Sequence, residues 1–87
     1  MKLDWEEEAL QDLNTIVDWA PKAAIRIVDE MEWLAGSPFP GMHRRLKDWP
    51  DNHACGIPPY IVFYIIREGY LVVTGIIDTR RHREPLY

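Results

Sequence analysis

The residues with the clearest chemical capacity lie near the end of the chain, where Arg80, Arg81, His82 and Arg83 are followed by Tyr87. An arginine guanidinium presents its N–H donors as a fork that matches a carboxylate or a phosphate. Histidine and tyrosine can exchange protons, and histidine does so near neutral pH. This tail therefore has the residue types needed to bind an anionic target or to carry out acid–base chemistry on a phosphate.

The charge of the chain is divided unevenly between its two halves. Residues 1–42 carry three basic and nine acidic residues, whereas residues 43–87 carry seven basic and five acidic residues, among them Arg44, Arg45 and Arg67. A polyanion would therefore meet the second half of the chain. The formal net charge of −4 nevertheless opposes non-specific binding to nucleic acid.

A structural interpretation of the same charges stands beside the functional one. Arg80 and Arg81 can pair with Asp78, with Glu84 or with acids of a helix. The segment His43-Arg44-Arg45 is expected to form a solvated margin between a loop and a strand, with contact to a phosphate or to the antitoxin as the functional alternative.

Other classes of site find little support in the sequence. The residues His43, His53, Cys55 and His82 lack the tight spacing of a zinc site, so neither a metal nor a cofactor is expected. No glycine-rich phosphate loop or dinucleotide motif is present. Cys55 is the only cysteine, which excludes an internal disulfide and is typical of a reducing cytoplasm.

No targeting or membrane segment is expected. The chain opens with Lys2 and four acids rather than with a basic and then apolar stretch, so we expect no signal peptide. The longest nearly apolar run, Ile57 to Ile66, contains two prolines and is half the length of about 20 residues that a membrane helix needs. We therefore expect one cytoplasmic domain over residues 1–87, without a membrane span.

The first half of the chain predicts a short strand and a helical hairpin. Met1 to Trp5 favours a strand, and Asp4 is the expected cap of the helix that follows. Apolar residues then recur at helical spacing at Ala9, Leu10, Leu13, Ile16, Val17 and Ala20. Pro21 ends this helix and begins the next one, because proline suits only the first turn. A second stripe contains Ala24, Ile27, Val28, Met31, Leu34 and Ala35 before Gly36 stops the helix.

The second half predicts a loop and then strands. Residues 36–41 contain four breakers in six positions and indicate a loop, and residues 50–52 indicate a turn. Strands are predicted over residues 60–67 and 70–77, joined by a tight turn at Glu68-Gly69. These strands are apolar on both faces, so we expect the helices to cover at least one face of the sheet, with Tyr60 and Tyr64 packed against them. If the ring of Phe63 is buried as well, its truncation to alanine should cost about 3–5 kcal/mol. Trp5, Trp19, Trp33 and Trp49 are each expected in or beside the core.

The order of these elements, with several short motifs, resembles the RelE/ParE toxin superfamily over the whole chain. The carrying segments are Glu8-Ala9 with Asp12-Leu13, Pro21 with Ala23-Ala24, Leu34 to Gly41, Tyr60 to Tyr64, and Ile76 to His82. The resemblance implies an α+β fold in which a short N-terminal strand and a helical hairpin pack on a small twisted antiparallel sheet. It also implies a type II toxin of a toxin–antitoxin module, of the kind associated with plasmid stabilisation, with a cognate antitoxin as partner.

The RelE branch of this superfamily is a metal-independent endoribonuclease that cuts messenger RNA on the ribosome. Arg81 and Tyr87 fall on the positions of its tail arginine and tyrosine, and His82 lies next to Arg81. That similarity makes Arg81, His82 and Tyr87 candidate catalytic residues. However, Ile61 stands where that branch has an arginine. Asn52, His53 and Ala54 replace its lysine-bearing strand, so several fixed cations are missing.

The ParE branch binds and inhibits DNA gyrase without catalysing a reaction. The Asp-Thr-Arg-Arg ending, the Ala-Pro-Lys-Ala-Ala segment and the apolar Ile61 are closer to this branch. We therefore favour a ParE-like gyrase inhibitor. The residues expected to bind its target are Arg80, Arg81, Arg83, Arg67, Arg44 and Arg45. Ribosome-dependent RNA cleavage is the enzymatic alternative. A third alternative is an inactive relative that only binds its antitoxin, through which alone it would reach operator DNA.

Overall fold

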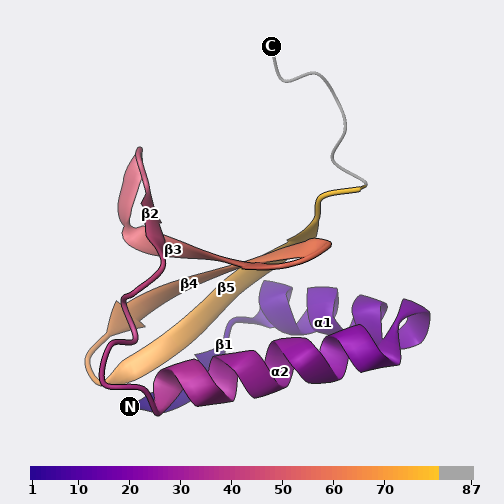
Figure 1. Cartoon of the computed structure of the whole chain (residues 1–87), viewed down its shortest axis with the longest axis horizontal. Coiled ribbons are helices and arrows are strands. Elements are labelled where there is room, and N and C mark those ends of the chain that lie inside the picture. The colour runs from indigo at the N-terminus through magenta and orange to yellow at the C-terminus, as the bar shows by residue number, and fades with distance from the viewer. Residues whose placement is uncertain (81–87) are drawn as a thin grey trace.

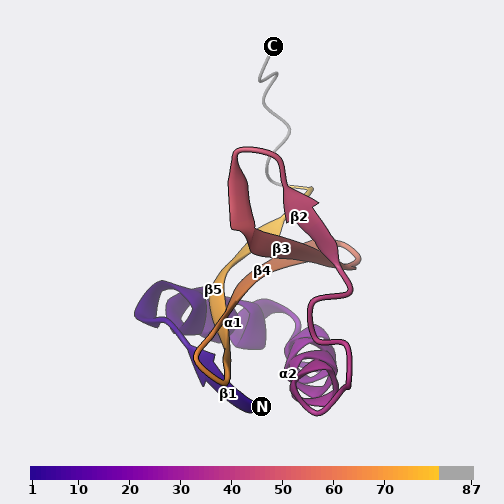
Figure 2. The ribbon, with the colours of Figure 1, turned by 90° about the vertical axis from the view of Figure 1, so that its left-hand side faces the viewer.

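The computed structural model describes residues 1–80 and has two layers, a sheet and a helical hairpin (Figure 1). The elements follow in the order β1 (Lys2–Trp5), α1 (Glu7–Trp19), α2 (Pro21–Ala35), β2 (Arg44–Leu46), β3 (Trp49–Ile57), β4 (Tyr60–Arg67) and β5 (Tyr70–Asp78). Both helices lie on one side of the sheet, and the hairpin of β2 and β3 rises on the other side (Figures 1 and 2). The expected α+β fold is confirmed.

The two helices follow the sequence pattern with two corrections. Pro21 is the first residue of α2, and Gly36 follows its last, as predicted. Asp4 does not cap α1, because it lies in β1 and the N-cap position is Glu6; its carboxylate instead accepts a hydrogen bond from the amide of Trp5 at 2.9 Å. Leu10 and Val17 are exposed, so the buried face of α1 is narrower than its apolar pattern suggests. Ala9 and Ile16 are the buried residues of this helix.

The sheet has the strand order β1-β5-β4-β3-β2, which places the two most apolar strands at its centre. The neighbours β3, β4 and β5 are antiparallel, whereas β1 pairs with β5 in parallel, so the sheet is mixed rather than wholly antiparallel. A parallel pair needs a long crossover, and the chain between β1 and β5 contains both helices and three strands. The N-terminal strand β1 is thus an edge strand of the sheet and pairs with the first half of β5.

The sequence predicted the turn between β4 and β5 correctly but misplaced the turn between β2 and β3. Glu68 and Gly69 join β4 to β5 with φ of 50° and 84°, the left-handed values that a tight hairpin requires. The turn expected at residues 50–52 is wrong, because β3 already begins at Trp49 and the chain reverses at Lys47-Asp48. The earlier turn lengthens β3 and makes β2 its partner.

The core lies between the helices and the covered face of the sheet. Tyr60 and Tyr64 are buried there, which confirms the prediction for both. Phe63 is only half-buried, because Tyr64 and Val62 point to the helices and Phe63 therefore points to the opposite face. The tryptophans depart most from expectation: Trp5 packs beside the core, but Trp19, Trp33 and Trp49 are 72%, 60% and 66% exposed.

Candidate functional site

The basic residues singled out from the sequence occupy three separate places in the fold. Arg44 and Arg45 are neighbours on β2, in the hairpin that stands away from the helices (Figure 2). Arg67 ends β4 beside the turn to β5, two strands away from β2 and at the same end of the sheet as the tip of that hairpin. Arg80 follows β5. Arg81, His82, Arg83 and Tyr87 lie outside the described residues. The structure therefore brings Arg44 and Arg45 together but separates them from Arg67.

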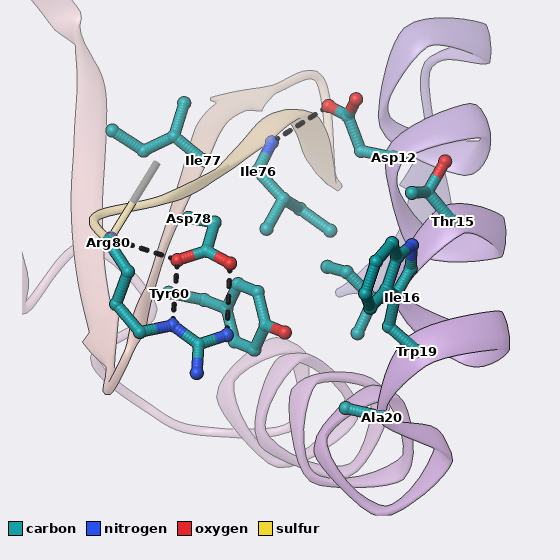
Figure 3. Close-up of a pocket in the computed structure, with 10 residues that line it drawn as sticks. All are labelled: Asp12, Thr15, Ile16, Trp19, Ala20, Tyr60, Ile76, Ile77, Asp78 and Arg80. Carbon is teal, nitrogen blue, oxygen red and sulfur yellow. Dashed lines mark hydrogen bonds and ion pairs between the residues drawn. The ribbon is translucent and has the colours of Figure 1, made fainter. Parts of the chain in front are cut away.

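Arg80 forms an ion pair with Asp78, two residues before it. Its Nε donates to Asp78 Oδ1 at 3.1 Å and its Nη2 donates to Oδ2 at 3.0 Å (Figure 3). The carboxylate also accepts from the backbone amide of Arg80 at 2.9 Å. This hydrogen-bonded partner raises the pKa of the Arg80 guanidinium. For Arg80, the structural interpretation foreseen in the sequence therefore holds, although its side chain remains 63% exposed and reachable.

Asp78 and Arg80 form one margin of an open pocket between α1 and the end of β5 (Figure 3). The pocket has a volume of about 580 Å³, and Trp19, Tyr60 and Ile76 contribute apolar walls. Asp12 of α1 reaches the strand here, where its Oδ2 accepts from the amide of Ile76 at 3.1 Å. Sequence reasoning missed both Asp12 and Trp19 as site residues. A polar residue within the apolar stripe of α1 was the available signal for Asp12.

The face of the sheet opposite the helices is mostly apolar. The pairing of the antiparallel strands, which shifts register once between Phe63 and Tyr64, places the following residues on this open face: Ala54, Ile61, Phe63, Ile65, Val72 and Ile77. Arg44 pairs with Ala54 and Arg67 pairs with Tyr70, so both arginines lie on this face, Arg44 on the outermost strand and Arg67 at the end of β4. The open face thus combines an apolar centre with cations at its borders.

Three positions at which the sequence lacks the cations expected from the RelE resemblance lie on this face. Asn52, Ala54 and Ile61 all point to it, since Asn52 pairs with Ile65 and Ala54 pairs with Phe63. The three positions therefore share one face, although Asn52 and Ile61 are four residues apart along the sheet. In this chain all three side chains are uncharged, so they offer no electrostatic stabilisation to a phosphate that gains charge during cleavage.

A buried polar cluster fastens the loop before β2 to the sheet. Tyr64 donates its hydroxyl hydrogen to the carbonyl of Pro40 at 2.7 Å, and His43 Nδ1 lies 2.9 Å from the same hydroxyl. The Tyr64 oxygen must then accept from His43, which requires a hydrogen on Nδ1. His53 Nδ1 likewise donates to the carbonyl of His43 at 3.0 Å. The His53 ring stacks on Tyr64 with their centroids 5.0 Å apart.

This cluster corrects the prediction for His43, which was expected on a solvated margin. Burial lowers the pKa of His43; the nearby Glu30 opposes the change and His53 adds to it. Burial also raises the pKa of Tyr64 to about 12 and that of Cys55 to about 11. The neutral forms of these groups are therefore favoured in the folded protein. No sequence signal connected His43 with a tyrosine 21 residues away.

The family model of the ParE toxin of type II toxin–antitoxin systems, parDE, matches residues 3–86. The match covers nearly the whole chain. The chain belongs to the ParE toxin family. A comparison of this sequence with curated proteins finds no match. The resemblance expected from the sequence is thus confirmed, and this ParE-family chain is a type II toxin by family.

Solved structures agree with the fold of the family. A chain of the chromosomal ParDE toxin–antitoxin system from P. aeruginosa superposes with a TM-score of 0.74 and 20% identity, covering 90% of this chain and 95% of that one. The conserved hypothetical protein HP0894 from Helicobacter pylori matches with a TM-score of 0.60 and 16% identity, covering 87% and 91%. At these identities the likeness concerns the fold.

Residues 1–80 offer neither a membrane-spanning helix nor a metal cluster. Neither helix of the ParE-family chain in this range is long and apolar enough to cross a membrane. Within the same range, no three histidine, cysteine or acidic side chains lie close enough together to hold a metal ion.

Proposed function

We propose that this ParE-family toxin arrests bacterial growth by binding and inhibiting DNA gyrase, without catalysing a reaction of its own. The observation that carries the proposal is the uncharged set Asn52, Ala54 and Ile61 on the open face of the sheet. Metal-free RNA cleavage needs cations there to stabilise the charged transition state. An apolar face with arginines at its margins is better suited to a protein surface.

Under this proposal the arginines are contact residues. Arg44 and Arg67 flank the open face, and Arg45 adds a second cation on the hairpin. Arg80, Arg81 and Arg83 would extend the contact at the end of β5. Arginine forks suit carboxylates of a protein and phosphates of its bound DNA equally well. The toxin would act in the cytoplasm, where gyrase works.

We also propose that a cognate antitoxin covers part of the toxin surface. The related P. aeruginosa chain belongs to such a toxin–antitoxin system. Trp19 and Trp33 support this because their exposed rings provide the large apolar anchors typical of protein interfaces. Recognition of the operator sequence would come only through the antitoxin.

RNA cleavage remains the second candidate because Arg81 and Tyr87 match the tail of the RelE branch, with His82 nearby as a proton donor. A toxin that has lost activity and only binds its antitoxin is the third. The three candidates predict different states of DNA and RNA in the cell, which makes one experiment sufficient to separate them.

Expression without the antitoxin tests the proposal. We expect growth arrest, loss of plasmid negative supercoiling and intact messenger RNA. Arg81→Ala should abolish the arrest and leave the fold intact, and Lys22→Ala, on the exposed surface of α2, is the matched control that should still arrest growth. Normal growth at confirmed soluble expression would remove the toxin claim. Arrest with cut messenger RNA and normal supercoiling would favour the nuclease.

A further inference from the structure

The hairpin of β2 and β3 concentrates basic and aromatic side chains in a projecting element. Arg44, Arg45 and Lys47 are all exposed, and the ring of Trp49 is 66% exposed. The chain reverses at Lys47-Asp48, so these side chains gather around the tip. Figures 1 and 2 show the hairpin standing clear of the helices and rising from the rest of the sheet. An element of this shape can enter a partner instead of lying flat on it.

The two arginines point to opposite faces of the hairpin. Arg44 pairs with Ala54, on the open face, and Arg45 pairs with His53, which is buried on the other face. A flat acidic protein surface would meet only one of these faces. A groove bordered by two negatively charged backbones meets both. The major groove of duplex DNA has such borders and admits a two-stranded ribbon.

Trp49 provides an apolar surface near the tip. It pairs with Leu46 across the turn, and its large indole is exposed to solvent. In a DNA groove this ring would contact apolar groups such as thymine methyls and deoxyribose. Burial of the ring would remove apolar area from water, which favours binding. A purely ionic contact would leave the exposure of this tryptophan unexplained.

The charge of the surrounding molecule determines which part can approach DNA. The hairpin carries three cations against Asp48 and Asp51, whereas residues 1–42 carry nine acids and three bases. The helices lie on the side of the sheet opposite to the hairpin (Figure 2). Approach by the hairpin therefore keeps the acidic helices away from the phosphates, where repulsion would otherwise be strongest.

We propose that the β2–β3 hairpin binds the major groove of duplex DNA, with Arg44 and Arg45 on the phosphates of the two strands and Trp49 in the groove. The contact goes beyond gyrase inhibition and does not depend on it, because it is measured with DNA alone. A toxin that fails to inhibit gyrase could still bind through this hairpin, so failure of one proposal is distinguishable from failure of the other.

Fluorescence anisotropy with a short fluorescein-labelled DNA duplex at low salt tests the inference. We expect weak binding whose logarithm falls linearly with the logarithm of salt concentration. Arg44→Ala and Arg45→Ala should each reduce that slope by about one. Trp49→Ala should weaken binding about tenfold with the slope unchanged. Lys22→Ala removes a cation from the helical side and should leave the slope unchanged.

Three results would overturn the proposal. One is the absence of duplex binding at low salt by folded protein, and another is equal binding by the wild type and the three hairpin variants. The third is stronger binding of another polyanion: single-stranded DNA would indicate base stacking, and polyglutamate at equal charge would indicate an acidic protein surface. Thermal unfolding of each variant, expected to match the wild type because all three side chains are exposed, confirms that the fold is intact.

Discussion

The imidazole of His43 and the hydroxyl of Tyr64 lie 2.9 Å apart and form the central link of a hydrogen-bond chain that ends at the carbonyl of Pro40. The chain joins the loop after α2 to β4 in the middle of the sheet. Arg44 follows His43 directly, so the position at which the basic hairpin begins depends on this link.

Tyr64→Phe should destabilise the protein by about 1–3 kcal/mol. The substitution keeps the ring but leaves the Nδ1–H of His43 and the carbonyl of Pro40 without their partner. Urea unfolding measures the difference. Tyr70→Phe, at an exposed position of β5, is the matched control and should change stability by less than about 0.5 kcal/mol. Equal effects of the two substitutions would mean that the buried hydroxyl contributes nothing.

Mild acid should lower the stability, because burial holds the pKa of His43 below its value in the unfolded chain. The unfolded state then binds more protons between the folded pKa and about 6.5. Stability is fully present above pH 6.5 and falls as the pH decreases through that window. His43→Asn, which retains a nitrogen donor near the Nδ1 position, should flatten the profile between pH 7.5 and 5.5. A wild-type profile that rises on acidification would contradict the lowered pKa.

Cys55 should be nearly unreactive in the native protein. Its side chain is 2% exposed and burial raises its pKa to about 11, so about one thiol in a thousand is ionised at pH 8. Reaction with an aromatic disulfide reagent should be at least about 100-fold slower in the folded protein than in concentrated urea. Similar rates in both conditions would show that the thiol is accessible through rapid local opening.

Asp12→Ala should destabilise the chain by about 1–2 kcal/mol, because the amide of Ile76 loses its carboxylate acceptor at the outer edge of β5. Asp12→Asn retains an oxygen acceptor and should recover at least half of the loss. Asp18→Ala, at an exposed position of the same helix, is the control. Urea unfolding distinguishes the three variants. A loss for Asp18→Ala as large as that for Asp12→Ala would assign the effect to the helix rather than to the edge of the strand.

Local sequence signals predicted the elements that depend on local chemistry. Pro21 and Gly36 limit α2, and Glu68-Gly69 forms the turn between the central strands, because each residue type favours one backbone conformation. Periodicity also identified the buried face of α2. The parallel pairing of β1 with β5 was not predicted, since an alternating pattern describes a strand but not its partner.

The contacts and exposures at the candidate site were harder to predict for a physical reason. Burial is the default expectation for tryptophan, yet Trp19, Trp33 and Trp49 are exposed, and only the assembled fold reveals where apolar area is left uncovered. The pairing of Arg80 with Asp78 was foreseen because it is local. The link between His43 and Tyr64 depends on tertiary structure, so it left no pattern in the sequence.

Gyrase supercoiling by purified components tests the central claim most directly. Relaxed plasmid, gyrase and ATP are incubated with increasing toxin, and ribosomes loaded with messenger RNA are incubated with the same preparation. The proposed function predicts loss of supercoiling at toxin concentrations comparable to that of gyrase, with the RNA intact. Codon-positioned RNA cuts with normal supercoiling would contradict it, and would make Arg81 and Tyr87 catalytic residues despite the uncharged Ile61.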